Sequence, residues 1–314
     1  MLVVDVAICS GDILTVHEAR KVSVAYADDL LNSDEQRFSD EIRAQGNTVM
    51  GEFSELAARL GAEQMIGVAT QAFRQSGNGQ QLLEDWQRDF GLDIRIVSQI
   101  EEARMAYRLV EARLESPDSG LVVWDIGAGS QQLVWRDCSD GCSDASWQHL
   151  NSTIASVSFR NRAIRQLQRP VDRQTPNPID AEEAEQLAVE LSAWLSAEEF
   201  AGLADYLAAG AEVVGIGGVH GASVANQLGL RPGEEITREA VRAALNRQLG
   251  RTDQDIGGDY ANTEVSNLIL VGTLMDRYGI DRYQVMPVNL TEAVLLELVD
   301  DCTPAGIGPT SIGH

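Results

Sequence analysis

Lysine is almost absent from the sequence. Lys21 is the only one among 314 residues, so arginine supplies nearly all of the positive charge. Lysine and arginine together number 24 against 48 aspartates and glutamates, and the formal net charge is −24. A field of this sign repels nucleic acid and anionic lipid, so we expect neither as a partner. A polyanionic ligand would need local arginines, backbone N–H groups and a metal ion to hold it.

Long apolar runs and a leader pattern are also absent. No stretch approaches the ~20 apolar residues of a membrane span, and acids at Asp5 and Asp12 interrupt a start that has no basic region. The sequence has few cysteines: Cys9, Cys138, Cys142 and Cys302. The CSDGC run allows a disulfide across a turn or a contribution to a metal site, but we expect reduced thiols in a cytoplasmic protein.

What the sequence does contain is typical of a globular α/β protein. Hydrophobic residues make up 44% of it, and its length suffices for two domains with their own cores. Short β-rich runs alternate with helical periodicities. Strands are predicted at 1–8, 22–26, 63–70, 92–98, 121–124, 133–135, 212–218 and 283–287. Helices are predicted within 33–62, broken near Gly46 and ended by Gly61, and at 100–115, 177–196, 237–250, 264–279 and 291–300.

The stretch LVVWDIGAGSQQLVW, residues 121–135, places an acid and a glycine-rich turn between two strands. Small residues at 127–130 let backbone N–H groups converge, and such a nest binds anions. Asp125 at the strand end suits a cation or a water, so the two features together suggest phosphate with a metal ion. An ordinary tight hairpin with an exposed aspartate explains the same residues equally well at this point.

Four stretches, taken in order, resemble the exopolyphosphatase/guanosine pentaphosphate phosphohydrolase (Ppx/GppA) family. They are VATQAFRQSGN (68–78), VSQIEEARMAY (97–107), DIGAGSQQL (125–133) and GIGGVHG (215–221). The resemblance covers nearly the whole chain and implies a two-lobed, actin- and hexokinase-like (ribonuclease H-like) α/β fold with a central cleft. It places a first lobe at 1–118, a second lobe at 119–300 whose last helix packs back on the first, and a flexible tail at 301–314.

The resemblance also implies roles for single residues. Glu102, the second glutamate of EEAR, is the general base, and Mg²⁺ is held by Asp125 and weakly by Gln132. Substrate phosphates are bound by Thr70, Arg74, Asn78, Gly127, Ala128, Gly129, Ser130, Gly217 and Gly218. Backbone N–H nests, Arg74 and Mg²⁺ then neutralise the charge of the substrate phosphates, and a carboxylate orients the attacking water. Without the resemblance, simpler interpretations are favoured: Glu102 as a first-turn helix acid, Arg74 as a surface ion-pair residue and GIGG as tight packing.

The sequence departs from the family pattern in two places. The family hairpin reads Asp-Ile-Gly-Gly-Gly-Ser-Thr-Glu-Leu, whereas here Ala128, Gln131 and Gln132 replace the middle glycine, the threonine and the glutamate. A methyl group at 128 interferes if that position needs positive φ, and a neutral Gln132 lowers metal affinity. The family's first strand and its Asp-x-Gly-Ser-Asn-Ser phosphate loop have no clear counterpart, so we expect a chain truncated at its N-terminus. The rival interpretation makes VVDVAICSG a degenerate form of that loop.

We therefore expect a phosphohydrolase that releases terminal phosphate from polyphosphate or guanosine pentaphosphate with Mg²⁺, with activity reduced by these departures. The alternative is a degenerate relative that binds polyphosphate, a nucleotide or a protein partner without turnover. An ATP-dependent sugar or acyl kinase on the same fold is a weaker alternative. The resemblance implies a cytoplasmic location and leaves a homodimer open, and the sequence does not choose between polyphosphate and nucleotide.

Overall fold

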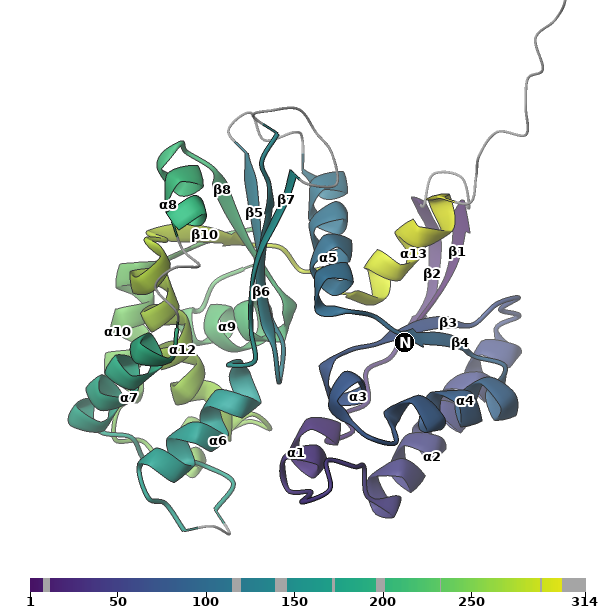
Figure 1. Cartoon of the computed structure of the whole chain (residues 1–314), viewed down its shortest axis with the longest axis horizontal. Helices are drawn as coiled ribbons and strands as arrows, with labels where there is room; N and C mark the ends of the chain where they lie inside the picture. The colour runs from purple at the N-terminus through teal and green to yellow at the C-terminus, as the bar shows by residue number, and fades with distance from the viewer. Residues whose placement is uncertain are drawn as a thin grey trace, which may run out of the picture.

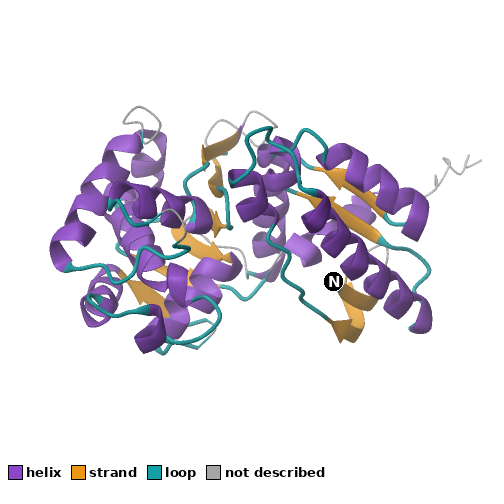
Figure 2. Ribbon diagram, turned by 90° about the horizontal axis from the view of Figure 1, so that it is seen from below, coloured by secondary structure: helices purple, strands orange, loops and turns teal. Residues whose placement is uncertain are grey.

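The structure, a computed structural model, describes residues 1–7, 12–114, 120–138, 146–170, 173–195, 201–231, 233–288 and 290–300. It has two lobes, and each lobe consists of strands covered by helices (Figure 2). In these ranges no helix combines the length and the hydropathy needed to cross a membrane. The tail predicted at 301–314 lies outside the described residues.

The first lobe contains two separate pairs of strands (Figure 1). β1 (Leu2–Ala7) and β2 (Asp12–Ala19) form an antiparallel hairpin, and β3 (Ile66–Ala69) runs parallel to β4 (Asp93–Ile96). The helices described in this lobe are α1 (Tyr26–Leu31), α2 (Asp40–Arg59), α3 (Gln71–Gln75) and α4 (Gly79–Phe90). No strand in the described ranges pairs with both β1 and β3. The expected truncation of the first strand stays a prediction.

The second lobe is built on one sheet with the strand order β7-β6-β5-β8-β10-β9. β5, β8 and β10 are parallel, while β6, β7 and β9 run antiparallel to their neighbours. The bounds are β5 (Leu121–Ile126), β6 (Gln131–Arg136), β7 (Trp147–Ser152), β8 (Glu212–Ile216), β9 (Glu235–Thr237) and β10 (Arg282–Val285). β5 is fully buried except at Asp125, which is partly buried. The sheet therefore carries one carboxylate to the end of its central strand.

Helices cover both faces of this sheet. One face packs against the core formed with α6, α7, α10 and α12. The bounds are α6 (Ser156–Gln166), α7 (Ala181–Trp194), α8 (Ala201–Ala208), the π-helical η3 (Val219–Val224), α9 (Ala225–Leu228), α10 (Arg238–Gln248), α11 (Asp253–Ile256) and α12 (Ala261–Tyr278). The other face packs against α5 (Gln99–Arg113) and α13 (Leu290–Asp300). α13 also contacts β1 and β3, so the last helix links the sheet of the second lobe to the strands of the first (Figure 1).

Three predictions from the sequence are wrong. Residues 22–25 form no strand, because the second strand lies earlier, at Asp12–Ala19, where it pairs with β1. Gly46 does not break a helix: it lies inside α2, where a Cβ would come 1.9 Å from the hydroxyl oxygen of Tyr26. Cys138 is not a reduced thiol, since its sulfur is in a disulfide. The other cysteines, Cys9, Cys142 and Cys302, lie outside the described residues.

Candidate active site

The β5–β6 hairpin forms as the sequence predicts and places Asp125 directly opposite Gln132. The Gly127 N–H closes its turn by donating to the Ser130 carbonyl over 2.9 Å. The carbonyl oxygen of Ala128 accepts the second and third amides of α6, at 2.8 and 3.3 Å. The hairpin tip is therefore fixed against the start of α6.

The outer side of the same tip presents free donors. The N–H groups of Ala128, Gly129 and Ser130 form no hydrogen bond with any residue that the structure describes. Consecutive free amides of this kind are the elements of an anion nest. No residue of the turn has positive φ, so the methyl group of Ala128 causes no backbone strain. The departure at 128 therefore leaves the nest intact.

The two glutamates of EEAR have different environments. Glu101 forms a capping box with Ser98: its carboxylate accepts the Ser98 N–H at 2.7 Å, and the Ser98 hydroxyl accepts the Glu101 N–H. These bonds lower the pKa of Glu101. Glu102 is buried, and burial raises its pKa against the opposing effect of Arg74. The simple interpretation as a helix-start acid therefore suits Glu101 and not Glu102.

Glu102 is paired with Arg74 across the sequence. Nη1 of Arg74 donates to Oε2 of Glu102 at 2.7 Å and to the carbonyl oxygen of Val97 at 2.8 Å. Nη2 of Arg74 is buried and has no acceptor among the residues that the structure describes. A buried guanidinium donor without an acceptor is costly unless a ligand supplies one. The pair thus leaves one donor of Arg74 and one oxygen of Glu102 for other partners.

Asp125 lies close enough to Glu102 for their charges to interact. Burial, and then the charge of Glu102, raise the pKa of Asp125 to about 7. Gly217, with φ of +85°, brings its backbone next to this carboxylate, and a Cβ there would come 2.5 Å from Oδ1 of Asp125. The first turn motif and the GIGG turn therefore meet at Asp125.

Gln132 is buried beside these acids and has a local partner. Its Nε2 donates to the Ser130 hydroxyl over 3.2 Å. Within the described part of the chain, no group of three or more His, Cys, Asp or Glu side chains is placed to hold a metal ion.

The remaining predicted site residues differ in their positions. Thr70 lies between β3 and α3, and its carbonyl oxygen accepts the Arg74 N–H. The Asn78 side chain forms hydrogen bonds within the first lobe. It accepts the Phe38 N–H at 2.8 Å and donates to the Phe38 carbonyl at 2.9 Å. Gly218 precedes η3 and has open space around it. The structure therefore brings Arg74 and Gly217 to the two acids, whereas Asn78 has its hydrogen bonds elsewhere.

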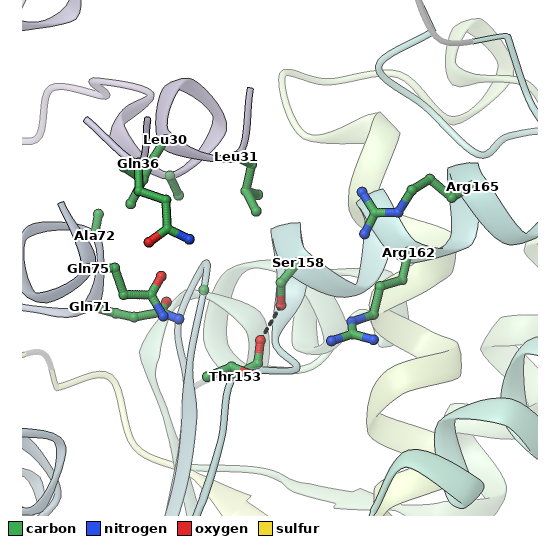
Figure 3. A pocket seen from close by; sticks show the side chains of 12 residues that line it. Leu30, Leu31, Gln36, Gln71, Ala72, Gln75, Thr153, Ser158, Arg162 and Arg165 are labelled. Atoms are coloured by element: carbon green, nitrogen blue, oxygen red, sulfur yellow. Dashed lines mark hydrogen bonds between the residues drawn. The ribbon is translucent and has the colours of Figure 1, made fainter. Parts of the chain in front are cut away.

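The lobes also contact one another near the hairpin tip. Gln71 of α3 reaches Gly129, where a Cβ would come 1.9 Å from its Oε1. Arg160 of α6 binds Asp28 of α1 at 2.5 Å. Arg162 and Arg165 from α6 and Gln71 line a pocket beside the tip (Figure 3). None of these side chains was predicted from the sequence, although four arginines at 160–169 in a chain of net charge −24 were a usable signal.

A family model and a curated relative match parts of this sequence. The model of the Ppx/GppA phosphatase family matches residues 4–246. Exopolyphosphatase 1 of Mycobacterium leprae is 26% identical over 86 residues, which are 27% of this chain and 25% of that protein. The match thus spans about a quarter of the length of this curated relative.

Solved structures extend the likeness to nearly the whole chain. An exopolyphosphatase from Cytophaga hutchinsonii has a TM-score of 0.73 at 14% identity and covers 96% of this chain and 94% of its own. An exopolyphosphatase-like protein has a TM-score of 0.72 at 17% identity, with 92% and 94% covered. The Aquifex aeolicus Ppx/GppA phosphatase has a TM-score of 0.63 at 18% identity, with 92% of both chains covered. These likenesses confirm the predicted α/β fold.

Proposed function

The chain belongs to the Ppx/GppA phosphatase family, and from that premise we propose that it releases the terminal phosphate of inorganic polyphosphate or guanosine pentaphosphate by attack of water. One observation carries this proposal: the buried Glu102–Arg74 pair and Asp125 lie together next to a turn with free N–H groups. An oriented base, a guanidinium donor and an anion nest are what phosphoryl transfer to water requires.

The terminal phosphate binds at the hairpin tip in this proposal. The N–H groups of Ala128, Gly129 and Ser130 donate to its oxygens. The unpaired Nη2 of Arg74 adds a charged donor. Because the global charge is −24, this local binding has to overcome a repulsive field.

Glu102 acts as the general base. Its Oε2 is held by Arg74, which leaves Oε1 to orient a water molecule. The water oxygen forms a bond to the terminal phosphorus while its proton passes to Glu102. The bond from that phosphorus to the bridging oxygen breaks, and the bridging oxygen leaves with the shortened chain. Burial raises the pKa of Glu102, and the hydrogen bond and charge of Arg74 oppose that rise and so favour the ionised form.

The residues at the strand ends fit Mg²⁺ if the ion is shared with the substrate. Mg²⁺ prefers hard oxygen donors and is commonly held by one or two carboxylates together with substrate phosphates and water. The Asp125 carboxylate and the side-chain amide oxygen of Gln132 are such donors, and the two residues lie directly opposite each other on β5 and β6. When bound, Mg²⁺ supplies charge neutralisation for the phosphates.

Replacement of Glu102 by glutamine tests the proposal. We expect Glu102→Gln to slow phosphate release from polyphosphate by about a hundredfold to ten-thousandfold, the usual cost of losing a general base. Polyphosphate binding should remain close to that of the wild type. Glu101→Gln is the matched control, since it alters the neighbouring acid of the same helical turn and should keep full activity. Equal turnover by Glu102→Gln and Glu101→Gln would remove Glu102 from the mechanism.

A second candidate function is binding without turnover. The buried, neutral Gln132 favours it, because a carboxylate at this position would bind Mg²⁺ more strongly. The same assay separates the two functions. Binding of polyphosphate by the wild type with no phosphate release in millimolar Mg²⁺ would support the second candidate.

A further inference from the structure

A pocket lies beside the hairpin tip, between the two lobes (Figure 3). It has a volume of about 230 Å³. One wall comes from the first lobe and includes Leu30, Gln71 and Gln75, and the other comes from α6. Gly129 of the hairpin tip lines the same pocket, so the pocket is continuous with the candidate active site.

The wall formed by α6 carries two arginines without an anionic partner in the described part of the chain. Arg162 and Arg165 form no hydrogen bond or ion pair with any described residue, and Arg162 only lies over the Trp194 ring at 5.0 Å. Their neighbours differ: Arg160 binds Asp28, and Arg169 binds Glu183. A free guanidinium is unexpected where acidic residues outnumber basic residues 48 to 24.

The remaining lining groups also suit an anion. None of the residues that line the pocket is acidic, and three of them, Gln36, Gln71 and Gln75, offer side-chain amides. In Figure 3 the side chains of Gln71 and Gln75 point across the pocket toward the α6 wall. Amide and guanidinium N–H groups are the donors that bind phosphate oxygens. The pocket therefore combines local positive charge with neutral donors.

The spacing along α6 indicates the shape of the ligand. Ser158, Arg162 and Arg165 are four and three residues apart, so they lie on one face of the helix. At a rise of 1.5 Å per residue the seven steps from Ser158 to Arg165 extend about 10 Å. The Ser158 end adjoins the hairpin tip, because its N–H bonds the Ala128 carbonyl. An extended anion fits this row better than a single phosphate ion.

We propose that this pocket is a second phosphate subsite, which holds the part of a phosphate chain next to the terminal group that is cleaved. The inference rests on the proposed function, since that function places the terminal phosphate at the hairpin tip. The ligand class is a linear oligophosphate, and guanidinium groups bind its oxygens in paired hydrogen bonds. Either inorganic polyphosphate or the phosphates of a guanosine polyphosphate supply that chemistry.

Calorimetric titration of the full chain in Mg²⁺-free buffer at fixed salt tests the subsite. The ligands are orthophosphate, tripolyphosphate, a longer polyphosphate and guanosine tetraphosphate. We expect Arg162→Ala/Arg165→Ala to raise the Kd of the chain ligands about tenfold to a hundredfold, as for lost hydrogen bonds to charged groups. Orthophosphate binding should be unchanged. Weaker binding of tripolyphosphate, with guanosine tetraphosphate binding unchanged, would assign the subsite to inorganic chains. Weaker binding of the nucleotide alone would assign it to the nucleotide.

Matched variants keep the result interpretable. Arg59→Ala removes an exposed arginine from the last turn of α2, away from the pocket, and should bind like the wild type. Arg165→Ala alone leaves the Arg162–Trp194 contact in place and should still weaken chain binding. Wild-type affinity in both Arg162→Ala/Arg165→Ala and Arg165→Ala would overturn the subsite, even if Glu102→Gln loses turnover. Weaker chain binding together with full turnover by Glu102→Gln would uphold the subsite and overturn the base. A wild-type chain that binds no oligophosphate would overturn both.

Discussion

Replacement of Asp125 by asparagine is expected to change how the stability of the protein depends on pH. Asp125 has its pKa raised from 3.8 to about 7, first by burial and then by the charge of Glu102. A carboxyl group whose pKa is higher in the folded than in the unfolded state destabilises the fold when it ionises. The wild-type protein therefore loses stability as the pH rises from about 4 to about 7.

The size of the effect follows from the shift. Each pKa unit corresponds to about 1.4 kcal/mol, so the rise to about 7 costs at most about 4 kcal/mol above pH 7. Between pH 5 and pH 8 the wild type should lose about 3 kcal/mol through this group. Asparagine at position 125 does not ionise. The free energy of unfolding of Asp125→Asn, relative to that of the wild type, should therefore increase by about 3 kcal/mol between pH 5 and pH 8.

Chemical denaturation at pH 5 and pH 8 in EDTA measures the difference. Asp255→Asn is the control of opposite sign, because hydrogen bonds from Thr252 lower the pKa of Asp255. That variant should lose stability relative to the wild type at pH 8. Mg²⁺ should stabilise the wild type more than Asp125→Asn, since the asparagine lacks the charged ligand. An unchanged pH dependence in Asp125→Asn would refute the raised pKa of Asp125 inferred from its burial and from the charge of Glu102.

Two further substitutions test the neighbours of Asp125. Gly217→Ala should destabilise the fold by about 1–3 kcal/mol in thermal or chemical unfolding, because φ is +85° and the Cβ would meet Asp125 Oδ1. Gly218→Ala, with open space and ordinary φ, should be close to neutral, and equal losses would contradict the close approach. Gln132→Glu should lower stability in EDTA by about 1 kcal/mol or more, because it places a further acid beside Asp125 and Glu102. In Mg²⁺ titrations it should bind the ion more tightly than the wild type, and unchanged affinity would show that Gln132 lies outside the metal site.

Much of the local structure could be predicted from the sequence. The hairpin at 121–136 formed because a buried strand, a turn of small residues and a second strand are adjacent in the chain. Ser98 and Asp180 cap helices α5 and α7, and each cap is a contact with a residue three positions away in the chain. The order of strands and helices also predicted an α/β fold.

Other predictions failed where a distant partner decided the outcome. The β-branched residues near 22–26 have strand propensity, but β1 hydrogen-bonds to Asp12–Ala19 instead. Glycine has low helix propensity, which favoured a helix break at Gly46. The close approach of Tyr26 explains why a glycine is nevertheless present within α2. Propensity is a weak guide in both cases because the deciding contact is tertiary.

The sequence by itself determined the turn of small residues, the capped helices and the family to which the pattern belongs. The resemblance singled out Glu102 from the adjacent Glu101, but helix position alone does not distinguish the two acids. Only the tertiary structure gives them different environments, because Arg74 lies 28 residues away and pairs with Glu102 and not with Glu101. The tertiary structure likewise decides that Arg162 and Arg165 have no acidic partner among the described residues, because it sets which lobe surface faces α6. Capping and turns depend on neighbours in the chain, whereas ion pairing and burial depend on which distant segments the fold brings together.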